Sequence, residues 1–199
     1  MQRISKIKKW IGGIYEGVDK RVLIAILAVM ILSTALRAYN FSEWLLVRAD
    51  QARDATIARQ AFENGPANLR ILGPKVDKVK IEGDVGAGDT FNLGPFYYYI
   101  QYASMVILGS ADPSVVALPD LIMSILTIPL FYIFLRQVFS KRISFIVTTL
   151  FSFSFILIQY SRFAWNPNQL FFWSILFVLG LYKTAVEKNK SRAGWWLVA

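Results

Sequence analysis

The residues best suited to chemistry in this chain are carboxylates, because the 199-residue sequence contains neither cysteine nor histidine. That composition excludes thiol nucleophiles, imidazole bases, zinc fingers and structural disulfides. Asp50 and Asp54 lie four residues apart, so they share one face of any helix that contains them, and Arg53 lies within reach of Asp50. One interpretation is a solvated helix with a local ion pair. The other is a carboxylate that faces a cavity and accepts a proton from a substrate hydroxyl. Spacing alone does not choose between them.

A second group of candidates lies in the short segment 161–168, SRFAWNPN. The guanidinium of Arg162 could hold a phosphate group and stabilise it as it leaves, or it could reach lipid headgroups from an interfacial position. Trp165 and Asn166 offer an aromatic face and an amide suited to a sugar, although Trp165 also fits a plain interfacial anchor. Tyr98 belongs to an aromatic run that forms either an interfacial belt or one wall of a binding site.

The overall composition places the chain in a lipid bilayer. Hydrophobic residues make up 55% of the sequence and the mean hydropathy is +0.44, which is too apolar for the surface of one soluble domain. The net charge of +9 does not indicate nucleic-acid binding, because the basic residues cluster beside apolar segments. Such clusters mark the cytoplasmic ends of membrane spans. Carboxylates would bind a hard ion such as Mg²⁺ or Mn²⁺, but the sequence alone establishes neither a metal site nor another cofactor.

The expected fold is all-α, a polytopic membrane helical bundle with a long first extracytoplasmic loop. The basic N-terminus leads into an apolar segment that has no cleavage site, which indicates a retained span with its N-terminus in the cytoplasm of a multi-pass protein of the cell membrane. The loop, residues 40–114, is expected to carry juxtamembrane helices at about 43–64 and 95–109. The spans are predicted at about 21–39, 115–135, 143–160 and 169–182, with an incomplete span at 193–199.

The segment 95–109 decides this topology. It holds about fifteen residues, whereas crossing roughly 30 Å of hydrocarbon at about 1.5 Å per residue takes about twenty. If it spanned the membrane, the basic loops 136–142 and 183–192 would both lie outside; as an interfacial helix, it leaves them inside with the N-terminus. We therefore predict an interfacial helix. Because the apolar segment 193–199 stops after a few residues, we expect the whole chain, 1–199, to be the N-terminal part of a larger transmembrane domain.

Several short motifs follow one another along most of the chain. An acidic residue stands early in a helix that ends at Gly65, and it is followed by GPFYYYIQYASMVILG, VVALPDLIMSILTIPLFYIFLRQVF and YSRFAWNPN. In this order they resemble the N-terminal part of a GT-C membrane glycosyltransferase. That superfamily includes protein O-mannosyltransferases and lipid A aminoarabinose transferases.

The resemblance implies an enzyme that transfers a sugar, with inversion, from a polyprenyl-phosphate carrier to an acceptor at the extracytoplasmic face. Asp50 corresponds to the early acidic residue, which would either organise the site or act as the general base, a role typically worth about 10²–10⁴-fold in rate. Residues expected to bind substrate are Arg162, Asn166, Trp165, Asp54 and Tyr98. The sequence does not reveal whether a protein, lipid or glycan is the acceptor. The alternative is a truncated, non-catalytic membrane scaffold or a transporter-like protein, although transporters more typically show paired broken helices in repeated halves.

Overall fold

The computed structural model describes residues 20–47, 49–69, 71–73, 75–76, 91–92 and 94–186. The predicted span at 193–199 lies outside these residues, as do the basic N-terminal cluster and residues 187–192 of the basic loop predicted at 183–192. In chain order the elements are α2 (Lys20–Ala38), α3 (Ala49–Asn64), η1 (Pro66–Asn68), β1 (Lys75–Val76), β2 (Phe91–Asn92), α4 (Phe96–Leu108), α5 (Pro113–Leu135), α6 (Lys141–Ser152), α7 (Phe155–Tyr160), η2 (Asn166–Gln169) and α8 (Leu170–Val186). The two short strands pair with each other in antiparallel fashion.

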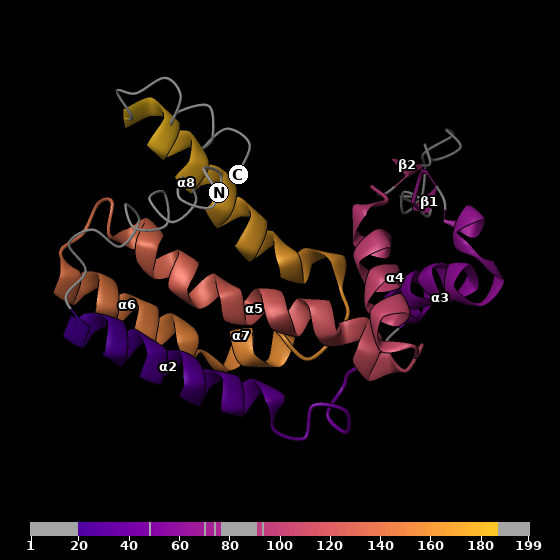
Figure 1. Cartoon of the computed structure of the whole chain (residues 1–199), viewed down its shortest axis with the longest axis horizontal. Coiled ribbons are helices and arrows are strands. Elements are labelled where there is room, and N and C mark those ends of the chain that lie inside the picture. Colours follow the sequence, from indigo (N-terminus) through magenta and orange to yellow (C-terminus); the bar gives the residue numbers. More distant parts are fainter. Residues whose placement is uncertain are drawn as a thin grey trace, which may run out of the picture.

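Helix α5 is the centre of the bundle. It packs against α2 and α6 on one side and against α8 on another, while α4 and α3 stand beside its N-terminal end (Figure 1). Three of the described helical segments are long and apolar enough to cross a membrane, namely Lys20–Ala38, Pro113–Leu135 and Asn166–Val186. The predicted fold class, a helical membrane bundle, is confirmed.

The segment expected as a continuous span at 143–160 is interrupted. Helix α6 ends at Ser152 and α7 begins at Phe155, so the last carbonyls of α6 lose their helical donors. Arg37, fully buried in the last turn of α2, supplies a replacement by donating from Nη1 to the Ser152 carbonyl at 2.9 Å. Its Nε also donates to Ser124 Oγ at 3.1 Å. One guanidinium therefore joins α2, α5 and the break between α6 and α7.

A proline in α5 has a similar consequence for α4. Pro119 lies inside α5 and has no N–H, so the carbonyl of Val115 has no helical donor. The hydroxyl of Ser104 in α4 donates to that carbonyl at 2.7 Å. This bond fixes α4 against the first turns of α5 and compensates for the missing backbone bond.

Helix α4 is too short to span the hydrocarbon. Its 13 residues extend about 20 Å at about 1.5 Å per residue, against roughly 30 Å of hydrocarbon. The helix ends at Gly109, whose left-handed backbone (φ 65°) directs its N–H to the Met105 carbonyl. Fully buried Ala58 packs with Met105 and Ala117 in the apolar core beside it.

Helix α3 begins at Ala49, later than the predicted start near residue 43. Residues 39–44 form a turn, in which Asn40 adopts a positive φ of 47°, and residues 45–47 have no regular secondary structure. Trp44 lies in that turn and meets Tyr39 edge to face, with 5.5 Å between the ring centroids. The guanidinium of Arg162 lies over the Trp44 ring, 5.0 Å from its centroid. These contacts favour a turn where the sequence pattern indicated a helix.

Candidate functional site

Six polar side chains from α3, α4, α5 and η2 are at least nine-tenths buried at the end of the bundle where these elements meet. We refer to them as the Tyr97 cluster, after the residue at the centre of the contacts described below. The members are Asp54, Tyr97, Tyr98, Gln101, Asp120 and Gln169. Burial of this many polar groups is costly unless each finds a partner, so the arrangement needs an explanation.

Two neighbouring tyrosines of α4 face the two acidic members of the cluster. The hydroxyl of Tyr97 donates to Oδ2 of Asp120 at 3.1 Å, and the charge of Asp54 also acts on Tyr97. Burial, followed by the charge of Asp120, raises the pKa of Tyr97 well above its ordinary value. Burial also raises the pKa of Tyr98, and the next largest cause is Asp54. Both hydroxyls therefore remain protonated at neutral pH, so each has a hydrogen to donate; the Tyr97 hydroxyl donates its own to Asp120.

Asp54 has a cationic partner, whereas Asp120 is bonded to a neutral one. Arg53 binds Asp54 Oδ1 through Nη2 at 2.9 Å and through Nε at 3.0 Å. Asp120 accepts from Tyr97 and lies beside Gln169, but its Oδ1 has no hydrogen-bond partner among the described residues. One carboxylate is thus electrostatically compensated, and the other retains an unused acceptor.

Unused hydrogen-bonding capacity recurs through the cluster. Within the described part of the chain, the Tyr98 hydroxyl, both amide atoms of Gln101 and Nε2 of Gln169 are buried without a hydrogen-bond partner. Native proteins satisfy such groups with other side chains, with ordered water or with ligand. The cluster can therefore accept polar molecules.

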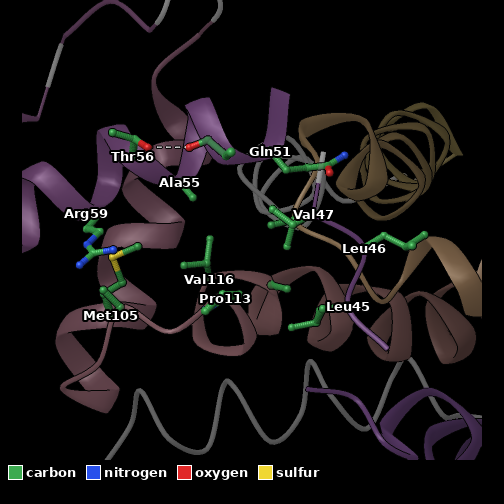
Figure 2. Close-up of a pocket in the computed structure, with 14 residues that line it drawn as sticks. Leu45, Leu46, Val47, Gln51, Ala55, Thr56, Arg59, Met105, Pro113 and Val116 are labelled. Carbon is green, nitrogen blue, oxygen red and sulfur yellow. Dashed lines mark hydrogen bonds between the residues drawn. The ribbon is translucent and has the colours of Figure 1, made fainter. Parts of the chain in front are cut away.

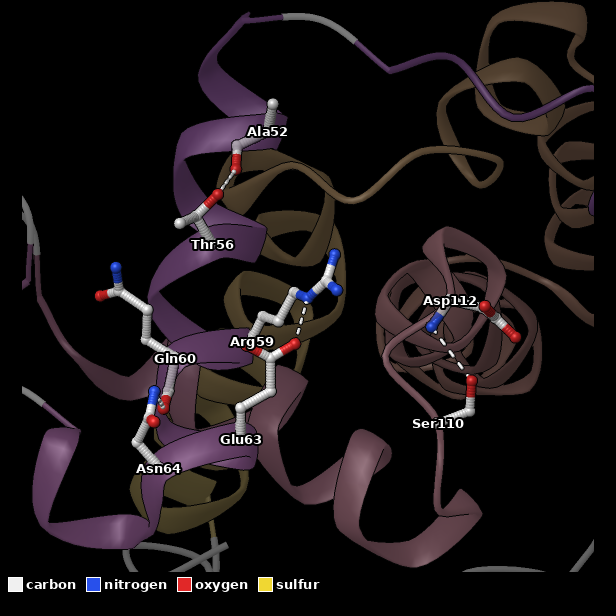
Figure 3. Close-up of polar contacts among 8 residues, drawn as sticks. All are labelled: Ala52, Thr56, Arg59, Gln60, Glu63, Asn64, Ser110 and Asp112. Carbon is white, nitrogen blue, oxygen red and sulfur yellow. Dashed lines mark hydrogen bonds and ion pairs between the residues drawn. The ribbon is translucent and has the colours of Figure 1, made fainter.

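The residues predicted to act are only partly brought together. Asp50 is the second residue of α3, and its side chain lies outside the described residues. Asp54 and Tyr98 lie together in the Tyr97 cluster. A separate ion pair lies on the exposed face of α3, where Arg59 binds Glu63 at 2.6 Å and Thr56 donates to the Ala52 carbonyl (Figure 3).

Arg162 is buried at the end of α2 instead of being open to solvent. Its Nη1 donates to the Tyr39 carbonyl at 2.8 Å, and its Nη2 donates to the Leu36 carbonyl. Burial lowers its pKa from the ordinary value. The structure thus gives Arg162 a capping contact with α2, and its role toward phosphate stays a prediction.

Trp165 and Asn166 are adjacent in sequence but have different surroundings. Trp165 stacks on Phe163, with 5.8 Å between ring centroids and 22° between planes, and also contacts Tyr160. Asn166 lines a cavity of about 210 Å³ between the start of α4, η2 and the start of α8, together with Tyr97 and Gln169. We call it the α4–α8 cavity.

A second cavity, also of about 210 Å³, lies between α3 and α5 and is mainly apolar. Figure 2 shows Val47, Ala55 and Val116 bordering it from three parts of the chain, with Gln51 and Arg59 on α3. We call it the α3–α5 cavity. Because Gln51 directly follows Asp50, this apolar space adjoins the first turn of α3.

No group of three or more acidic side chains suited to a metal occurs among the described residues. The side chain of Asp50 is not among those residues, so a Mg²⁺ or Mn²⁺ ion stays a prediction.

Sequence reasoning missed several members of the site. Gln101 and Gln169 were not singled out, although each is an amide within or beside a strongly apolar helix. An uncompensated amide in such a segment is costly to bury, and that cost was the available signal. Asp120 was not missed: a carboxyl inside a predicted span is a functional candidate from the sequence alone. Nothing in the sequence indicated that Tyr97 would be its partner.

The fold and the buried cluster together define a helical membrane protein with an acidic, hydrogen-bonding site at one end of its bundle. The sequence pattern of the dolichyl-phosphate-mannose-protein mannosyltransferase family matches residues 92–199, and the chain belongs to this family. It is therefore a membrane glycosyltransferase of the GT-C type. No curated protein and no solved structure shows a significant match to the chain. The family match begins after α3, so the role of Asp50 does not follow from it.

Proposed function

We propose that this protein transfers a sugar from a polyprenyl-phosphate carrier to an acceptor hydroxyl at the extracytoplasmic face of the membrane. The observation that carries the proposal is membership of the mannosyltransferase family through residues 92–199. The buried acidic and amide groups around Tyr97 support it, because recognition of a sugar requires several donors and acceptors in one place.

Asp50 is the proposed general base. It stands in the first turn of α3, where the unpaired backbone N–H groups favour a negatively charged side chain. Its carboxylate takes the proton of the acceptor hydroxyl while the acceptor oxygen forms a bond to the anomeric carbon of the sugar. The bond from that carbon to the carrier phosphate breaks, and its electron pair leaves with the polyprenyl phosphate. Attack from the side opposite the leaving group inverts the anomeric centre.

The substrate-binding roles are divided among the remaining predicted residues. Asp54 and Tyr98 would bind through the buried polar cluster, and Asn166 and Trp165 would face the sugar from the segment before α8. Arg162 already donates two hydrogen bonds to α2 carbonyls, so it would meet the donor phosphate through its remaining N–H groups. A phosphate bound there would be joined directly to the end of the first span.

The α3–α5 cavity fits the apolar part of the carrier. Its lining is mainly aliphatic and comes chiefly from α3, α5 and residues 45–47. An isoprenoid unit next to the phosphate would gain about 25 cal/mol for each Å² of apolar surface that leaves water. Its position beside the first turn of α3 would bring the phosphate end of the carrier near Asp50.

The experiment is donor turnover in membrane vesicles that contain the full protein. Polyprenyl-phosphate mannose with labelled mannose is added, and the release of polyprenyl phosphate and the anomeric configuration of the product are followed. The proposal predicts release of the carrier and a product of the opposite anomeric configuration. If the carrier is never released, a scaffold role replaces the enzyme; if configuration is retained, the one-step displacement is wrong.

A further inference from the structure

The α4–α8 cavity is too large to be a packing defect that holds one water molecule. Its volume is about 210 Å³, whereas a single water requires about 10–15 Å³. It opens between the first turn of α4 and a part of the chain distant in sequence, which consists of η2 and the first turn of α8 directly after it. A space of this size with polar walls can receive a small ring.

Two aromatic side chains form part of its wall. The rings of Phe96 and Trp173 meet edge to face with 5.5 Å between their centroids. Indole Nε1 of Trp173 donates to Oε1 of Gln169 at 3.4 Å. This bond uses one of the two lone pairs of the Gln169 amide oxygen and orients the amide relative to the aromatic wall.

The polar part of the wall offers both donors and acceptors. Nε2 of Gln169 is buried and has no hydrogen-bond partner among the described residues. Tyr97 gives its hydrogen to Asp120, so the Tyr97 oxygen retains capacity to accept one. The amide of Asn166 can do either. Aromatic faces beside alternating donors and acceptors suit a molecule with C–H surfaces and hydroxyl groups.

The chemistry of the described wall favours one part of a phospho-sugar donor over the other. The described residues that line the cavity carry no formal charge, so this part of the wall offers a phosphate no cationic partner. The nearest carboxylate along the hydrogen-bond chain, Asp120, is engaged by Tyr97. An uncharged sugar ring fits this wall better than a phosphate or a charged sugar does.

We infer that the α4–α8 cavity is the subsite for the sugar of the donor, an uncharged pyranose held by Gln169, Asn166 and the Phe96–Trp173 wall. The inference deepens the proposed function and rests on it. Gln169 acts here as a specificity residue: its amide N–H meets a sugar hydroxyl that the bare carrier lacks.

The test compares two carriers on the full protein in detergent micelles. Competition against labelled polyprenyl-phosphate mannose gives Kd values for that donor and for sugar-free polyprenyl phosphate. Gln169→Leu removes the amide at similar size, and Phe177→Leu, an exposed position further along α8, is the control. We expect Gln169→Leu to reduce the preference for the sugar-bearing carrier about tenfold and to leave the Kd of the sugar-free carrier unchanged. The control should keep the full preference.

An unchanged preference in Gln169→Leu would overturn the inference and leave the cavity as a water-filled space. Equal weakening of both carriers would also overturn it, because that result indicates a structural role. Trp173→Phe is the second variant: it keeps an aromatic wall but removes the N–H that holds Gln169, and it should lower the preference by a smaller factor. If Gln169→Leu does not fold and Trp173→Phe does, an undiminished preference of Trp173→Phe for the sugar-bearing carrier would overturn the inference.

The two proposals fail in distinguishable ways. Asp50→Asn should keep the preference for the sugar-bearing carrier while it loses turnover. Turnover by the wild-type protein with no sugar preference in binding would overturn the subsite but not the enzyme. Absence of both donor binding and turnover in the wild-type protein would overturn the two together.

Discussion

Tyr97 and Asp120 are joined by a 3.1 Å hydrogen bond between two side chains that are almost completely buried. The bond connects α4, which is too short to span, to α5, the central span of the bundle. It therefore links the short helix α4 to the longest apolar helix described, and each partner depends on the other to avoid an unsatisfied buried group.

We predict that the two residues are energetically coupled. Tyr97→Phe leaves Oδ2 of Asp120 without its donor and should lower the free energy of unfolding by about 1–3 kcal/mol. Asp120→Leu leaves the Tyr97 hydroxyl without its acceptor and should lower the free energy of unfolding by a similar amount. The double variant removes both groups, so neither is left unpaired. Unfolding in SDS, followed by circular dichroism, should show a double loss smaller than the sum of the single losses by at least about 0.5 kcal/mol. Additive losses would mean that the bond contributes nothing.

A second coupling should exist between Ser104 and Pro119. Ser104→Ala removes the donor to the Val115 carbonyl and should cost about 1 kcal/mol in the same unfolding measurement. With Pro119→Ala already present, the new backbone N–H can bond to that carbonyl, so the cost of Ser104→Ala should fall toward zero. An equal cost in both backgrounds would show that Pro119 is not the reason for the Ser104 bond.

Arg37 should be needed for the stability of the interrupted segment. Arg37→Met removes the donor to the Ser152 carbonyl, and a buried acceptor left in this state costs about 1–3 kcal/mol. The exposed control, Arg142→Met, should change stability by less than about 0.5 kcal/mol. Amide hydrogen exchange should also accelerate in α6 and α7 only in the Arg37 variant. Unchanged exchange there would contradict the role assigned to this guanidinium.

The apolar pattern and the lengths of its segments were enough to predict the fold class. Segment length also separated α4 from the spans, because 13 residues do not reach across the hydrocarbon. The break at Ser152–Phe155 was not predictable from hydropathy, since the residues on both sides are apolar and Arg37, which compensates it, is distant in sequence. The hydropathy of a local segment does not reveal a partner that is distant in the sequence.

The candidate site was predictable in part for the same reason. Asp54 and Tyr98 could be selected by residue type, and they do lie together. Gln101 and Gln169 could not be assigned to the site from the sequence, because their amides enter the buried cluster only when α4 and η2 pack against α5. The burial of Arg162 was not predictable, because the sequence does not show that the end of α2 meets its guanidinium.

Asp50→Asn in the full-length protein is the most direct test of the central claim, which is that the Asp50 carboxylate accepts the proton of the acceptor hydroxyl. Turnover of polyprenyl-phosphate mannose is measured together with protein abundance and carrier binding, and Asp112→Asn, an exposed carboxylate at the start of α5, is the matched control. We predict that turnover falls about 10²–10⁴-fold in Asp50→Asn while abundance and binding persist, and that the control keeps full turnover. Undiminished turnover in Asp50→Asn would contradict the account.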